Sequence, residues 1–389
     1  MEYKSDDESS CLEEQPAADS KHTPNGCSKR SRSSDSDTPS VSGYTKKKKN
    51  DARCLPQSVS CWSRLYTERL GIFFNEKATG ITEFFKLSET SYAFDYPLKG
   101  ENKNLLDTLV NVTKEKMCKA RILNWSVTEE ATQGFPFLEE SARCQDILAD
   151  LHDIAVKDEY PDMHTVQYLR RSHYKVEEFF MQLQKLYLKR KDGEKLAGSD
   201  FRQLLAGFSR VFHLNVEQVL SKRTMKIGSS TISSVPDLCF WAQFPFPLYS
   251  VTIVTVAEVK LDEMKQVDES NNFEISMAVG NKVLGRHAGE LLLEVGNSAF
   301  RNVALGIICM QTMIIFTYLE ISPKHLALIE EKGDADCRLE IDGKRSGTIY
   351  YTRPYDYMVE KDRCEILEFL FWLGLHSLPL DYRPKPARV

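Results

Sequence analysis

Two apolar segments separated by a proline-rich turn constrain the fold of this chain more than any other feature. The first begins directly after Pro236-Asp237, and the second is a β-branched run that ends in Glu258-Val259-Lys260. β-Branched residues favour strands, and the Phe-Pro-Phe-Pro sequence at 244–247 favours a turn between them. In an antiparallel hairpin about this turn, Asp237 comes within about three residues of Glu258.

The end of this hairpin gathers charged side chains. Glu258 and Lys260 share a face of their strand, because successive side chains point to opposite faces. Two carboxylates and an ammonium group then meet, which suits a magnesium ion and a water positioned against a phosphodiester. The alternative interpretation is a polar hairpin end at which Lys260 only neutralises two surface acids.

The order of these residues resembles the PD-(D/E)XK nuclease superfamily. Its pattern is an acid on a helix, then Pro-Asp, then Glu-x-Lys on the following strand. Here Glu217, in Asn215–Leu220, is the candidate helix acid, and Asp237 and Glu258-Val259-Lys260 follow in order. The resemblance covers residues 199–375. It implies an α+β fold with a restriction-endonuclease-like core, in which helices flank a mixed central β-sheet.

The resemblance also implies a metal-dependent nuclease that hydrolyses phosphodiester bonds in nucleic acid, DNA rather than RNA. Asp237, Glu258 and the backbone carbonyl of Val259 would bind Mg²⁺ or Mn²⁺. Lys260 would assist the attacking water, and Glu217 would complete the site. Because a fold does not determine activity, the alternative is a catalytically inactive nuclease-fold protein that binds nucleic acid or protein in the nucleus. A host-targeted effector or mobile-element protein is a third interpretation.

Four further side chains are candidates for contact with nucleic acid. Lys222 and Arg223 follow Glu217 on the same expected helix, and Arg286 and His287 lie near the start of a later helix. The net charge of −5 means that such binding needs a local basic surface. For His287, an ordinary surface position at a helix start is the alternative.

Hydrophobic periodicity predicts the other elements. Helices are expected over 141–157, 165–191, from Ser199, and over 362–376. The helix over 165–191 is rich in lysine and arginine. It is either an ordinary amphipathic helix with a solvated face or one that also lines a DNA channel. The apolar run at 303–319 fits two buried strands and a tight turn better than a membrane span, and Asp342-Gly343 indicates a further hairpin.

These elements divide the chain into four parts. We expect a disordered basic and serine-rich tail at 1–60, a mostly helical region at 61–198 that packs on the core, the nuclease-like domain at 199–378, and a polar tail at 379–389. The ten cysteines show no zinc-ligand spacing, and the polar first residues are not a secretory signal, so a reducing compartment is expected.

The N-terminal tail carries two basic clusters, which are Lys29, Arg30, Lys46, Lys47, Lys48 and Lys49. Their separation is typical of a bipartite nuclear-import signal, which predicts an import receptor as a partner and the nucleus, otherwise the cytoplasm, as the location. The alternative is a solvated tail that attracts polyanions without specificity.

Overall fold

The structure is a computed structural model that describes residues 55–92, 101–116, 145–146, 149, 153, 163–217, 222–243, 250–260, 273–333, 337–341 and 343–377. All of them belong to one compact unit, Ala52–Val389. The two basic clusters, most of the helix predicted over 141–157 and the tail at 379–389 lie outside the described residues.

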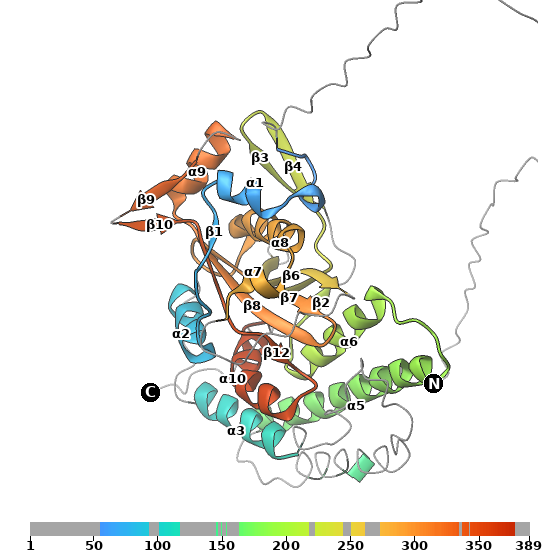
Figure 1. The fold of residues 1–389 in the computed structure, drawn as a ribbon. Helices are drawn as coiled ribbons and strands as arrows, with labels where there is room; N and C mark the ends of the chain where they lie inside the picture. The colour runs from blue at the N-terminus through green and yellow to red at the C-terminus, as the bar shows by residue number, and fades with distance from the viewer. Residues whose placement is uncertain are drawn as a thin grey trace, which may run out of the picture. The chain divides into compact units, whose positions relative to one another are not determined.

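Helices and strands both run through this unit (Figure 1). The helices are α1 (Arg64–Arg69), α2 (Ile81–Ser91), α3 (Glu101–Lys116), α5 (Met163–Lys191), α6 (Gly198–Val211), α7 (Ile275–Ala278), α8 (Asn281–Glu294), α9 (Pro323–Lys332) and α10 (Glu360–Ser377). The strands are β1 (Phe73–Phe74), β2 (Val216–Glu217), β3 (Arg223–Ile227), β4 (Ser230–Ser234), β5 (Leu238–Gln243), β6 (Ser250–Lys260), β7 (Val303–Met310), β8 (Met313–Glu320), β9 (Leu339–Ile341), β10 (Lys344–Ser346), β11 (Thr348–Tyr351) and β12 (Tyr355–Asp356).

A mixed sheet forms the centre. Within the described part of the chain it has eight strands in the order β1-β11-β8-β7-β6-β5-β2, with β12 also paired to β8. The pairs β5–β6 and β7–β8 are antiparallel, whereas β6 and β7 are parallel. A parallel pair needs a long crossover, and α7 and α8 lie in the one between β6 and β7. The predicted α+β class with a mixed central sheet is therefore confirmed.

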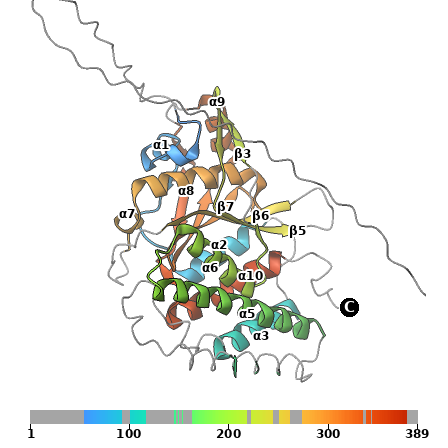
Figure 2. The same cartoon turned by 90° about the vertical axis from the view of Figure 1, so that its right-hand side faces the viewer.

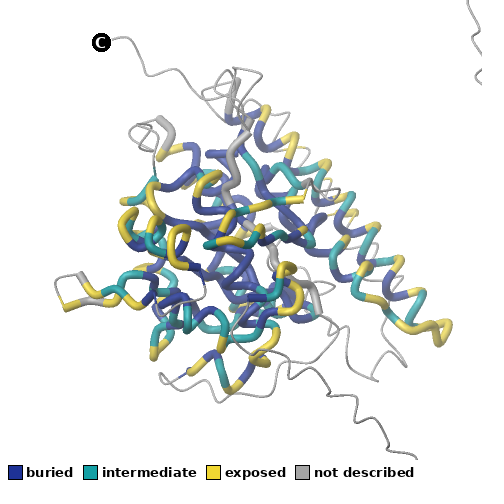
Figure 3. Tube along the Cα trace, turned by 90° about the horizontal axis from the view of Figure 1, so that it is seen from above, coloured by how far each residue is buried: buried dark blue, intermediate teal, exposed yellow. Residues whose placement is uncertain are grey.

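Helices cover both faces of this sheet (Figures 1 and 2). One apolar core joins the sheet to α2, α3, α5, α6 and α10, and we call this side the α6 face. The other core joins it to α1, α7, α8 and α9, and we call this side the α8 face. Figure 3 shows the buried segments concentrated at the centre and the exposed segments toward the periphery.

β7 explains why both faces need cover. All of its residues are buried, and they alternate between the two cores, with Ile307 on the α6 face and Ile308 on the α8 face. A two-residue turn joins β7 to β8, and Gln311 in that turn has φ 56°. The predicted pair of buried strands is thus confirmed. No helix in the described ranges is long and apolar enough to span a bilayer.

Packing begins earlier in the chain than we predicted. Leu55 and Val59 are buried in the core of the α8 face, and the Trp62 indole donates to the Pro56 carbonyl oxygen at 2.8 Å. Residues 55–60 therefore belong to the folded unit and not to the tail, because burying these side chains offsets the entropy of ordering them. The region 61–198 also supplies a strand, β1, to the sheet, and shares one unit with the rest.

The long helix predicted over 165–191 is confirmed as α5, and α10 matches the helix predicted over 362–376. The prediction that Ser199 caps α6 is wrong. The N-cap is Ala197, whose backbone N–H donates to the Asp200 carboxylate at 2.8 Å. This is the bond that the acid at the third helical position makes in a capping box. The helix ends where His213 adopts φ 66°.

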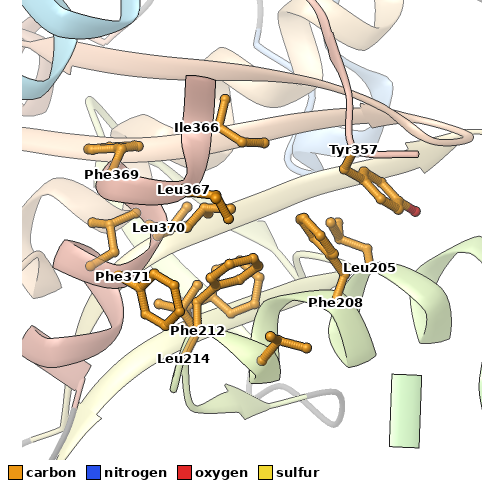
Figure 4. Close-up of a cluster of buried hydrophobic side chains, with 14 of the residues drawn as sticks. Leu205, Phe208, Phe212, Leu214, Tyr357, Ile366, Leu367, Phe369, Leu370 and Phe371 are labelled. Carbon is orange, nitrogen blue, oxygen red and sulfur yellow. The ribbon is translucent and has the colours of Figure 1, made fainter. Parts of the chain in front are cut away.

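α6 and α10 meet in an aromatic cluster on the α6 face (Figure 4). Phe212 and Phe371 pack edge to face with ring centroids 5.0 Å apart, and Phe208 stacks on Tyr357 at 4.7 Å. This contact fixes α6 against the sheet, and with it the side chains that α6 presents toward the end of β5.

Candidate functional site

The predicted hairpin of β5 and β6 is confirmed. Leu238 pairs with Val256 at the end of the ladder, so Asp237 stands one residue beyond that pair and next to the end of β6. Side chains of Leu238 and Phe240 lie in the core of the α6 face. Since neighbouring residues of an extended segment point to opposite sides, Asp237 belongs to the α8 face.

A bulge in β6 changes the face to which its last residues belong. Val256 pairs with Ile307 of β7, but the next pair is Glu258 with Ile308, which leaves Ala257 as the extra residue. Ile307 packs in the core of the α6 face, and Ile308 packs in that of the α8 face. The bulge therefore shifts the positions of Glu258 and Lys260 to the α8 face, where Asp237 lies.

Two arginines from opposite faces reach Asp237. The Arg202 guanidinium on α6 lies 2.9 Å from Oδ1 of Asp237, and that of Arg286 on α8 lies 3.9 Å from the same oxygen. The Asp237 side chain is 17% exposed, so part of it faces solvent. Arg202 is a site residue that sequence reasoning missed. It precedes Asp237 by 35 residues, and no local pattern links the two residues.

Glu290 is a second acid that we did not predict. It is buried on α8, where its Oε1 accepts from Arg286 Nε at 3.0 Å and from Ser234 Oγ at 2.9 Å. Its Oε2 is buried and has no hydrogen-bond partner among the described residues. Burial raises the pKa of Glu290 to about 8, with Asp237 adding to the rise and with Arg286 and Ser234 opposing it. The i,i+4 spacing of Arg286 and Glu290 was the one sequence signal for this pair.

Replacing Glu290 by glutamine tests whether the pKa of Glu290 is raised in the folded protein. A carboxyl group whose pKa is higher in the folded state contributes stability that is fully present below its unfolded pKa, near 4.5, and is lost as the pH rises through about 8. The wild type should therefore lose stability relative to Glu290→Gln between pH 5 and pH 9. Urea unfolding midpoints of both proteins across this range measure the difference. A constant difference would contradict the raised pKa.

Glu217 does not lie on a helix. Together with Val216 it forms β2, in which Glu217 pairs with Cys239 of β5. The edge of β5 offers unpaired backbone groups, and pairing with them stabilises an extended segment over the helix that the local sequence favours. Glu217 thus remains near the Asp237 end of β5, but it reaches that place from the sheet edge.

Lys222 and Arg223 are also outside any helix. Arg223 opens the β3–β4 hairpin, where Gly228 with φ 57° makes the turn, and the exposed Lys222 precedes it. Arg223 Nε lies 2.9 Å from the carboxylate of Glu294, a buried residue of α8. This ion pair holds the hairpin against α8, so Arg223 has a structural role that the sequence did not indicate.

Of the pair Arg286 and His287, only Arg286 faces the site. His287 is buried, with Nε2 at 2.6 Å from the Thr317 hydroxyl, and burial together with the Arg286 charge lowers its pKa to about 3. In this position it does not reach nucleic acid, contrary to our prediction. A helix that packs on a sheet buries every third or fourth residue, and His287 falls on the packed side.

The described acids do not by themselves form a complete metal centre. Within the described ranges, no three His, Cys, Asp or Glu side chains are grouped so as to hold a metal ion. Asp237 and Glu290 are both in contact with Arg286. Val259 is paired with Cys309 in the parallel ladder, next to the positions of Glu258 and Lys260.

The residues that resemble the PD-(D/E)XK pattern are only partly arranged as that pattern implies. Asp237, Glu258 and Lys260 lie at one end of one hairpin, whereas the acid expected on a helix lies on a strand. Comparisons with known proteins provide no relative: no family model matches this chain, and neither a curated protein nor a solved structure matches it.

Proposed function

We propose that this chain is a metal-dependent nuclease with a restriction-endonuclease-like core, which hydrolyses phosphodiester bonds in nucleic acid and prefers DNA to RNA. The observation that carries the proposal is the bulge at Ala257. It gives Glu258 and Lys260 positions on the sheet face to which Asp237 belongs. Without it, the alternation that begins at Val254 would assign them to the α6 face.

The donor atoms at this place suit a hard divalent cation. Asp237 supplies a partly exposed carboxylate. Carboxylate oxygens are preferred ligands of Mg²⁺ and Mn²⁺. Glu258 and the carbonyl of Val259 are the further proposed ligands. A cation at Oδ1 of Asp237 would compete with Arg202, so the proposal requires Arg202 to release that oxygen.

Each group at the site would then have its own role in the reaction. A bound metal ion would supply an acidified water and neutralise phosphate charge. Lys260 would orient the attacking water and stabilise charge on the phosphate. Arg286 would contact a phosphate oxygen, and Glu290 would hold the Arg286 guanidinium in place through the bond at 3.0 Å.

One contact favours the second candidate, a catalytically inactive nuclease-fold protein that binds nucleic acid or protein. The guanidinium of Arg202 already balances the Asp237 charge at 2.9 Å, and that of Arg286 lies near it. A carboxylate neutralised in this way needs no metal ion. In both cases we propose a nuclear location, with an import receptor bound to the basic clusters at 29–30 and 46–49.

A cleavage assay with the full chain tests the proposal. Single- and double-stranded DNA and RNA are incubated with the protein in Mg²⁺, in Mn²⁺, or in a chelator, and binding is measured in parallel. We expect cleavage in the presence of metal, on DNA more than RNA, and none in the chelator. Binding of nucleic acid without cleavage of any substrate would support the inactive scaffold instead.

Metal binding is predicted independently of cleavage. A ligand that binds only the folded state at ten times its dissociation constant stabilises that state by about 1.4 kcal/mol. Millimolar Mn²⁺ or Mg²⁺ should therefore raise the melting temperature of the wild type but not that of Asp237→Asn. Asp192→Asn, an exposed aspartate beyond the end of α5, is the matched control and should respond as the wild type does. The same metal response in all three proteins would exclude this site.

A further inference from the structure

α5 exposes a regular row of large apolar side chains. Tyr174, Met181 and Leu188 are 59%, 50% and 43% exposed, although the opposite side of the same helix is buried in the core of the α6 face. They are spaced seven residues apart, the repeat that keeps side chains on one side of a helix packed against a second helix. We call this row the α5 seam.

Charged residues of opposite sign lie beside the seam at equal distances before and after Met181. Glu177 and Glu178 lie one turn before Met181, and Lys185 lies one turn after it. Glu177 and Lys185 are both exposed. Glu178 is held by Lys175 at 2.6 Å, so its carboxylate stays beside the seam. In an antiparallel pair of such helices, acidic residues of one helix come level with the lysine of the other.

We propose that the α5 seam binds a second copy of this chain, with the two α5 helices antiparallel about a twofold axis at Met181. A twofold interface is isologous, so each contact occurs twice. Met181 then meets the partner's Met181, and Tyr174 packs against the partner's Leu188. Lys185 lies level with the partner's Glu177.

The charges select this orientation. A parallel pair in register would place Glu177 beside the partner's Glu177 and Lys185 beside the partner's Lys185, and like charges at such positions destabilise a helix pair. Tyrosine and methionine are also enriched at protein interfaces. One helix contact is a small interface, so association in the micromolar range is expected.

Sedimentation velocity of the full chain across the micromolar range is the first test. The wild type should form dimers as its concentration rises. Met181→Lys should weaken association at least about tenfold, because it brings two ammonium groups together at the twofold axis. Met277→Lys, at a methionine of α7 that is 62% exposed, is the matched control and should associate as the wild type does.

Charge reversal distinguishes this contact from other modes of association. Glu177→Lys and Lys185→Glu should each weaken self-association, since each sets like charges level across the seam. An equimolar mixture of the two variants should recover dimers, because opposite charges then face each other at both places. Equal melting temperatures would show that the variants are folded. A monomeric wild type, an equal effect of Met181→Lys and Met277→Lys, or no recovery on mixing would each overturn the proposal.

Discussion

Lys260→Ala is expected to lower the single-turnover rate of nucleic-acid cleavage by about two to four orders of magnitude while changing affinity little. Lys260 lies two positions beyond Glu258 on β6. Their partners on β7, Met310 and Ile308, both pack in the core of the α8 face, so the positions of Lys260 and Glu258 belong to that face. Negative charge at the phosphate is greatest in the transition state, so loss of an ammonium group there should appear mainly in the rate.

The control for this experiment is Lys222→Ala. Lys222 is exposed just before β3, and its loss should alter affinity and the salt dependence of binding rather than the rate. Single-turnover cleavage and direct binding of one labelled DNA measure both quantities. Equal rate losses in the two variants, or a Lys260→Ala defect confined to binding, would contradict a catalytic role for Lys260.

Gly374→Ala is expected to destabilise the folded unit by about 3 kcal/mol, at the upper end for overpacking. Gly374 lies on α10 where that helix crosses the end of α6, and an added Cβ would overlap the Phe212 carbonyl oxygen. A backbone atom cannot move aside as a flexible side chain can, so α6 and α10 would have to separate. That separation would disturb the aromatic cluster of Phe212 and Phe371 (Figure 4).

Gly296→Ala is the matched control, because an added Cβ there meets no atom within 4 Å among those described. Urea unfolding followed by circular dichroism gives the free energy of unfolding for both variants and the wild type. A Gly374→Ala protein as stable as Gly296→Ala would show that the α6–α10 contact is looser than described. Because α6 carries Arg202, a separated α6 should also weaken the bond from Arg202 to Asp237.

Elements that rely on local patterns were predictable from the sequence. The strand pairs β5–β6 and β7–β8 follow from β-branched runs beside a proline-rich sequence or a short polar break, and α5 and α10 follow from apolar residues at helical spacing. The proximity of Asp237 to Glu258 follows from the hairpin alone. Each of these features is encoded within a few turns or strands of chain, where periodicity reports burial directly.

Features that depend on distant partners were not predictable. Asn215–Leu220 resembles a helix start, yet Val216 and Glu217 pair with β5, because an open sheet edge stabilises extended backbone more than local propensity stabilises a helix. Arg202 and Glu290 joined the site only when α6 and α8 packed on opposite faces of the sheet. No pattern in one sequence indicates which side chains two separate helices will bring together.

The sequence by itself thus determined the β5–β6 hairpin and the residue types at its end, and the tertiary structure decided which face those residues occupy. Strict alternation from Val254 assigns Glu258 to the α6 face, but the register of β6 against β7 changes at Ala257 and moves it to the α8 face. The physical reason is that a bulge forms only when a neighbouring strand fixes the register on both sides of the extra residue. β7, far along the chain, supplies that neighbour.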